Sequence, residues 1–144
     1  MQNSISAFAL IADELKQTKG FMNQQLPCPD IRLAEFIDYI KNRQGKMLRA
    51  SVLLLCGKLT GQTNQLHIST AAINEMIHAA TLLHDDVIDN SSSRRFLPTA
   101  NNLWGANQAV LLGDFLLSRA FSVLAGLNRK DINTIIADTA ATIC

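Results

Sequence analysis

The sequence has little of what builds a sheet or a disulfide-stabilised fold. Its 144 residues contain only 3 cysteines, 3 prolines and 7 glycines, and aromatic residues make up 6%. No stretch alternates apolar and polar residues as strands do, and neither a hairpin dipeptide nor an internal repeat is present. These absences exclude β and repeat architectures and favour an all-α protein.

A strong charge of either sign is also absent. Lys and Arg number 13 against 12 for Asp and Glu, which gives a net charge of +1, and the basic residues are scattered. Nucleic-acid binding is not expected, because it requires a basic stripe or patch. No apolar run of about 18 residues occurs without a polar interruption, so no transmembrane segment is expected.

The three cysteines, Cys28, Cys56 and Cys144, have no short metal-binding spacing. Their odd number, in a sequence without a signal-peptide pattern, favours reduced thiols and a cytoplasmic location. We expect Cys56 to be a core residue.

Apolar residues make up 48% of the chain, enough for one core. Their spacing predicts a single α-helical domain over 1–144, a bundle of about six largely antiparallel helices. Ser4 or Ser6, Asp30 and Asp131 are candidate N-caps. The expected helices are 4–26, 31–41, 46–59, 66–88, 107–127 and 131–143, with a short one at 99–103 inside a loop.

Two features point to the core. The run from Val52 to Cys56 is apolar on all sides, which predicts deep burial within the third helix. Trp104, the single tryptophan, is expected to be a packing anchor. His84 is directed away from the acidic face described next, so we assign it to packing or to a contact behind that face.

The segment from Glu75 to Asp89 is the most informative stretch. At 100° per residue, His78, Asp85 and Asp89 lie within roughly 40° of one another, and Thr81 is on the same side. Asp85 and Asp89 are about 6 Å apart at a helix end that is already negative, so they should attract a cation. Hard oxygen ligands that leave room for water suit Mg²⁺. The alternative is a solvated acidic helix end.

Cations in two other segments complement these carboxylates. Lys46 and Arg49 open the third helix, and Arg94 and Arg95 follow the acidic segment across a short turn. Arginine forks and lysine point charges are what a diphosphate requires.

These residues, in this order and spacing, resemble the first half of a trans-isoprenyl diphosphate (polyprenyl) synthase. The resemblance covers about residues 40 to 127. Met47 and Ala50 stand where the family usually has Arg and Pro, and Phe96-Leu97 stands where Gly-Lys is frequent; none of these is a ligand position. The matching residues are Gly45-Lys46-x-x-Arg49, His78, Asp85-Asp86-x-x-Asp89 and Arg94-Arg95.

The resemblance implies a prenyltransferase that condenses an allylic diphosphate with isopentenyl diphosphate in isoprenoid biosynthesis. Asp85 and Asp89 would hold Mg²⁺, Arg94 would bind the allylic diphosphate, and Asp86 would tune the charge or orient its neighbours. It also implies that isopentenyl diphosphate is bound by Lys46, Arg49, His78 and Arg95.

Ala80 and Thr81 precede the acidic end of the helix by about one turn. Short-chain members of the family carry bulky aromatic residues here to close the product cavity, whereas both residues are small in this chain. A long-chain product is therefore expected.

The sequence lacks the second aspartate-rich motif of the family, so we expect this chain to be inactive alone. The alternative is a non-catalytic small subunit or regulatory partner of a heteromeric prenyl synthase. A homodimer is expected through helices 107–127 and 131–143. Its buried contacts would include Leu116, Leu117, Phe121 and Leu124.

Overall fold

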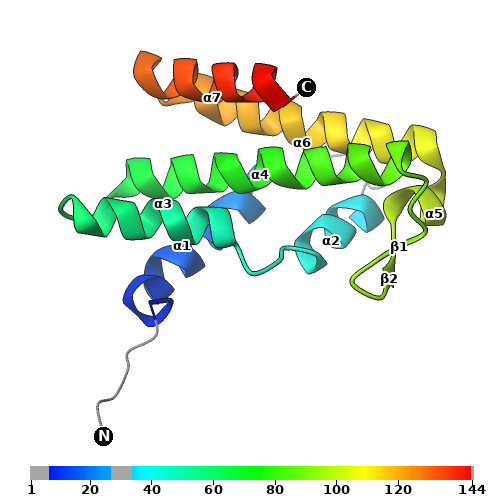
Figure 1. Cartoon of the computed structure of the whole chain (residues 1–144), viewed down its shortest axis with the longest axis horizontal. Helices are drawn as coiled ribbons and strands as arrows, with labels where there is room; N and C mark the ends of the chain where they lie inside the picture. Colours follow the sequence, from blue (N-terminus) through cyan, green and yellow to red (C-terminus); the bar gives the residue numbers. More distant parts are fainter. Residues whose placement is uncertain (1–6, 27–33, 144) are drawn as a thin grey trace, which may run out of the picture.

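The computed structural model describes residues 7–26 and 34–143, and nearly all of their regular structure is helical (Figure 1). The all-α prediction is confirmed, with seven α-helices in the described residues when the short helix of the loop is counted. A 3₁₀ turn, Ala9–Ile11, leads into the first helix. The helices are α1 Ala12–Gln25, α2 Ala34–Asn42, α3 Leu48–Leu59, α4 Gln65–Ile88, α5 Ala100–Trp104, α6 Ala106–Gly126 and α7 Lys130–Ile143.

The helix starts follow local sequence signals only in part. The side chain of Asn64 accepts hydrogen bonds from the backbone N–H groups of Leu66 and His67, and the His67 side chain faces the Asn64 N–H, which forms a capping box for α4. Asp131 is not the N-cap of α7, because the helix already begins at Lys130. The Asp131 carboxylate instead accepts hydrogen bonds from the Arg129 side chain. The candidate caps Ser4, Ser6 and Asp30 lie outside the described residues.

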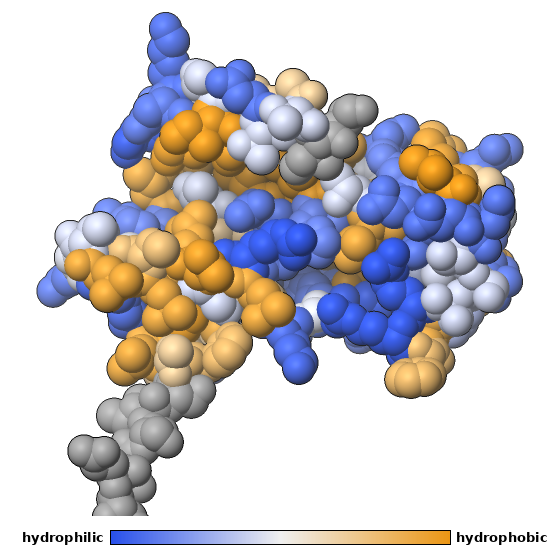
Figure 2. Space-filling view, in the orientation of Figure 1, coloured by the Kyte–Doolittle hydropathy of each residue, from blue (hydrophilic) through white to orange (hydrophobic). Residues whose placement is uncertain are grey.

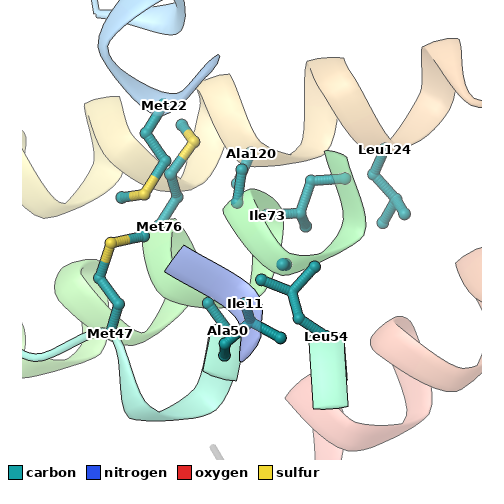
Figure 3. Close-up of a cluster of buried hydrophobic side chains, with 11 residues drawn as sticks. Ile11, Met22, Met47, Ala50, Leu54, Ile73, Met76, Ala120 and Leu124 are labelled. Atoms are coloured by element: carbon teal, nitrogen blue, oxygen red, sulfur yellow. The ribbon is translucent and has the colours of Figure 1, made fainter. Parts of the chain in front are cut away.

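The two longest described helices, α4 and α6, form the centre of the fold and pack against each other along their length. One core cluster joins the first half of α4 to the second half of α6, through residues such as Ile73 and Leu124 (Figure 3). The other joins the second half of α4 to the first half of α6, through residues such as Leu83 and Leu116. The two helices are therefore antiparallel, and α1 and α3 cover the first cluster.

The prediction that Val52 to Cys56 is deeply buried is wrong. Leu54 is fully buried, but Val52 is 62% exposed and Cys56 is also exposed. The reason is that α3 packs through a single face, on α1 and α4, and its outer face has no partner among the described residues. Figure 2 shows apolar surface over the end of the molecule where α1 and α3 lie.

A two-stranded antiparallel hairpin, which the sequence did not predict, follows α4. Strand β1 is Ser93–Arg94 and β2 is Leu97–Pro98, with Arg94 paired to Leu97. The turn consists of Arg95 and Phe96, both with positive φ, at 50° and 65°. Hairpin turns of this kind usually contain Asn or Gly, so nothing in the local sequence indicates it.

By length and apolar composition alone, α6 could cross a membrane, a test that core helices of water-soluble proteins also pass. In the structure α6 buries Ala109, Leu112, Gly113, Leu116, Ala120 and Leu124. The expected absence of a transmembrane segment stays a prediction.

The His84 side chain packs against α6 at Gly113, which has no side chain to occupy this space. Its Nε2 lies 3.2 Å from the Val110 carbonyl oxygen and 3.4 Å from a carboxylate oxygen of Asp114. Since a carbonyl only accepts, Nε2 carries the proton in this contact. A β-carbon at Gly113 would overlap the His84 ring. This contact agrees with the packing role expected for His84.

We predict that Gly113→Ala destabilises the chain by about 1–2 kcal/mol. Displacing His84 crowds the α4–α6 contact and breaks its hydrogen bond, which outweighs the gain of about 1 kcal/mol in helix propensity. In a His84→Ala background the same change should stabilise the chain, because only the propensity gain remains. Urea denaturation of the two single variants and the double variant measures this coupling. Additive effects would contradict the role of Gly113.

Candidate active site

A cavity of about 300 Å³ opens between the segment before α3, the middle of α4 and the hairpin. This cavity is lined by five of the residues that were predicted to bind diphosphate or to take part in catalysis. They come from three separate segments of the chain. Figure 2 shows a hollowed, strongly hydrophilic area on this face of the molecule. The five residues are Lys46, Arg49, His78, Arg94 and Arg95.

The base of this cavity is apolar. Met22, Met47 and Met76 all line it and are at most 8% exposed. Figure 3 shows their side chains converging from α1, the segment before α3 and α4. Methionine fills irregular space and adapts to different shapes. The cavity thus combines a cationic wall with a deformable apolar base, as a ligand with a charged head and a hydrocarbon tail requires.

The segment before α3 has a specific backbone path. Lys46 precedes the helix instead of belonging to its first turn as expected, and Met47 adopts a left-handed conformation with φ of 51°. The backbone N–H of Ala50 donates to Glu75 Oε1 on α4 at 2.9 Å. Gly45 lies so close to Arg95 that a β-carbon there would be 2.7 Å from Nη1. The backbone is therefore held on the C-terminal side of Lys46 by Glu75, and on its N-terminal side Gly45 leaves room for Arg95.

Glu75 is a functional residue that sequence analysis missed. It satisfies one of the otherwise unpaired N–H groups in the first turn of α3 from a position on another helix. One signal was available, since Glu75 precedes His78 by three residues and thus lies on the same side of α4.

The three aspartates at the end of α4 have different environments. Asp85 and Asp89 are exposed, whereas Asp86 is 3% exposed. Arg94 donates to the Asp86 carboxylate from Nε at 2.9 Å and from Nη2 at 2.8 Å. This bond is the main reason that the pKa of Arg94 is raised. Asp86 therefore holds the Arg94 guanidinium in place; its expected role at the site stays a prediction.

Asp85 and Asp89 are suited to a hydrated cation. They stand one turn apart on the last turn and C-cap of α4, where the carbonyl dipoles add negative charge. Within residues 7–26 and 34–143 no group of three or more His, Cys, Asp or Glu side chains could enclose a metal ion. Two exposed carboxylates match a metal that keeps several waters and binds substrate phosphates, as Mg²⁺ does.

His78 lies on the cavity wall. Partial burial, and then the positive charge of Arg49, lower the pKa of its imidazole below the ordinary value of 6.5, against the opposing effect of Glu75. The neutral ring can accept one hydrogen bond and donate another.

The residues proposed to control chain length do not line this cavity. Ala80 is fully buried in the core cluster that contains Ile37 and Leu116. The Thr81 hydroxyl donates to the His78 carbonyl oxygen at 2.9 Å. Below the acidic end, α4 contributes Ala79, Leu82 and Leu83 to the cavity wall instead.

An aromatic group supports the cavity from the side of α2. Trp104 packs against Phe36, with ring centroids 4.5 Å apart, and against Tyr39 at 5.1 Å. The expectation that Trp104 is a packing anchor is confirmed. Tyr39 and Arg43, which were not predicted, line the cavity.

The chain is similar to known proteins over most of its length. The Polyprenyl synthetase family matches residues 30–144, and the chain belongs to this family. An all-trans-nonaprenyl-diphosphate synthase (geranyl-diphosphate specific) of Rhodobacter capsulatus is 38% identical over 131 residues, which are 88% of this chain and 40% of that protein. An octaprenyl diphosphate synthase of Escherichia coli (strain K12) is 37% identical over 93% of this chain and 42% of that protein.

Solved structures agree with this assignment. A decaprenyl diphosphate synthase from Rhodobacter capsulatus superposes with a TM-score of 0.88 at 33% identity, over 95% of this chain and 42% of that one. A polyprenyl synthase from Caulobacter crescentus CB15, complexed with calcium and isoprenyl diphosphate, gives 0.87 at 30% identity over the same shares. The chain thus spans well under half the length of these relatives.

We predict that His78 makes stability depend on pH. Because folding lowers its pKa, the neutral form is favoured in the folded state. The contribution of His78 to folding stability is fully present above its unfolded-state pKa near 6.5. This contribution is lost as the pH falls through the folded-state pKa. Urea denaturation between pH 7.5 and pH 5 should therefore show a larger loss of stability in the wild type than in His78→Gln. Equal losses would contradict the prediction.

Proposed function

We propose that this chain supplies the first aspartate-rich half of the active site of a long-chain polyprenyl diphosphate synthase, which condenses an allylic diphosphate with isopentenyl diphosphate. The observation that carries the proposal is the meeting of five predicted ligand residues at one cavity beside the acidic end of α4. The long-chain product is supported by the names of the relatives, which include octaprenyl and nonaprenyl synthases. Mass spectrometry of the products of the complete enzyme tests the chain length.

In this proposal Asp85 and Asp89 hold Mg²⁺, which when bound neutralises charge on the departing diphosphate. Arg94, already oriented by Asp86, donates to the same diphosphate. The allylic carbon–oxygen bond breaks and the electron pair leaves with the diphosphate. Preorganised positive charge favours this step because it is aimed at negative charge that develops in the transition state.

Lys46, Arg49, His78 and Arg95 hold isopentenyl diphosphate in the cavity, so that its double bond faces the allylic carbon. The double bond supplies the electron pair of the new carbon–carbon bond, and a proton is then lost from the condensed product. The contribution of these four residues is binding and orientation.

The second candidate function is a non-catalytic subunit that binds diphosphates for a full-length partner. The short span relative to its relatives favours neither candidate. Retention of Asp85, Asp89 and both arginines favours the synthase, since a purely structural subunit does not need them. In either case we expect this chain to be catalytically inactive on its own, because one acidic site is too few to neutralise a departing diphosphate.

We also propose a homodimer and a cytoplasmic location. Exposed apolar side chains on α6, namely Val110, Leu111 and Phe121, support an interface along this helix, and Ile135 is exposed on α7. The expected contacts need a correction, because Leu116 and Leu124 are at most 5% exposed and belong to the core of the chain itself. The location rests on cysteine usage, and cell fractionation tests it.

We predict that the chain binds an allylic diphosphate in a Mg²⁺-dependent manner, and that Asp85→Asn weakens this binding by about tenfold, the equivalent of one charge-assisted interaction. Titration calorimetry with geranyl diphosphate, with and without Mg²⁺, measures it. Asp114→Asn removes a carboxylate on the neighbouring helix and serves as the matched control. Equal affinity of the wild type and Asp85→Asn would overturn the proposed role of the acidic end.

We predict that light scattering coupled to gel filtration gives a mass about twice the 15.8 kDa of one chain. Phe121→Glu should produce monomer or aggregate, because it buries a charge in the interface. The control is Leu59→Glu, which changes an 86% exposed residue of α3 and should leave the mass unchanged. A monodisperse wild-type monomer at micromolar concentration would contradict the dimer.

A further inference from the structure

Arg43 is a cation of the cavity wall that the proposed reaction does not use. Its guanidinium carbon lies 3.9 Å from the centroid of the Tyr39 ring. Both residues are half-buried and line the cavity. A guanidinium held against an aromatic face keeps a fixed plane, while its N–H groups remain directed outward in that plane.

The partner ring is itself fixed. Tyr39 packs edge-on against Trp104, with centroids 5.1 Å apart. Burial raises the pKa of the Tyr39 hydroxyl, so the ring carries no charge at neutral pH. The backbone N–H of Arg43 donates to the Ile40 carbonyl at 3.1 Å, which attaches this residue to the end of α2. Arg43 is therefore anchored on an element different from those that hold the other cations.

The side chains around the cavity carry more positive than negative charge, and this excess is available to an anionic ligand. Five Arg and Lys side chains line it, against two carboxylates. Both carboxylates are already engaged, Glu75 by the Ala50 N–H and Asp86 by Arg94. The cations come from three directions: Arg43 from the end of α2, Lys46 and Arg49 from around the start of α3, and Arg94 and Arg95 from the hairpin. A single phosphate needs only two such groups, whereas an anion with two phosphates offers further oxygens to a third.

We propose that Arg43, held against Tyr39, is a further ligand-binding residue of this cavity, which contacts the terminal phosphate and so distinguishes diphosphates from monophosphates. The inference rests on the proposed function of the cavity as a diphosphate site. It assigns to Arg43 and Tyr39 a role in specificity, in addition to the binding role proposed for Lys46 and Arg49.

Calorimetric titration of the 144-residue chain with inorganic pyrophosphate and with inorganic phosphate, in the absence of divalent metal, tests the proposal. Arg43→Gln should weaken pyrophosphate binding by about tenfold, the loss expected for one charge-assisted hydrogen bond, and phosphate binding by less than about twofold. Tyr39→Phe keeps the ring and should bind as the wild type does. Tyr39→Leu removes the support and should lose part of the discrimination.

The matched control is Arg129→Gln, which removes the same charge from an exposed ion pair before α7 and should change neither affinity. Arg43→Lys keeps the charge without the planar fork and should give intermediate discrimination. Thermal melting tests whether each variant is folded. If Arg43→Gln is not folded, Arg43→Lys takes its place in the comparison.

The outcomes separate this inference from the function on which it rests. If Arg49→Gln abolishes pyrophosphate binding while Arg43→Gln leaves both affinities unchanged, the cavity is a diphosphate site and the role of Arg43 is wrong. Equal losses for phosphate and pyrophosphate in Arg43→Gln would mean a general charge effect and would also overturn the proposal. No pyrophosphate binding by the wild type would overturn the function of the cavity together with the inference.

Discussion

The buried carboxylate of Asp86 imposes the constraint on which the arrangement of this site depends. A carboxylate removed from water must be paired, because an isolated buried charge costs several kcal/mol. Arg94 pairs with it through two nitrogens, and this contact ties the hairpin to the end of α4. The hairpin also places the Arg95 guanidinium close to Gly45, in the segment before α3. Two left-handed residues in the hairpin turn, at about 1–2 kcal/mol each, are tolerated within this framework.

The rest of the fold supports α4 from behind. Its two halves belong to different core clusters, and α6 runs antiparallel to it through both. This packing covers α4 with apolar side chains and leaves the stripe with Glu75 and His78 facing the cavity. The stripe ends at the exposed pair Asp85 and Asp89. One helix thereby carries His78, proposed to bind the diphosphate, and the proposed metal-binding pair, at a separation fixed by its own geometry.

Helical periodicity was sufficient to predict the fold class, the extent of α4 and the residues that share its polar face, because these depend on neighbours in the sequence. It failed for α3, where an apolar run packs on one side only, since burial depends on which partners are present. It also failed for the hairpin, whose turn of Arg95 and Phe96 has no turn-forming preference. The role expected for Asp86, to tune the charge or orient its neighbours, did not specify Arg94 as its partner.

The two residues missed at the site, Glu75 and Arg43, are placed by different kinds of contact. Glu75 caps a helix that lies 25 residues earlier in the chain, and Arg43 is held by a ring on the preceding helix. Glu75 is placed by a tertiary contact, which no local pattern encodes, whereas Arg43 follows Tyr39 by four residues, a spacing that the sequence does contain. The resemblance to a known family identified the residues that family members share, and Arg43 and Glu75 were not among those matched positions.

Because Arg94 pairs with Asp86, its side chain loses rotamer entropy during folding and not during ligand binding. A free arginine side chain carries about 2 kcal/mol of rotamer entropy, which a ligand would otherwise have to overcome on binding. Here that freedom is removed when the chain folds, since a buried acceptor already fixes the guanidinium. Folding stability rather than ligand affinity carries this cost, and the incoming anion meets a side chain that is already in place.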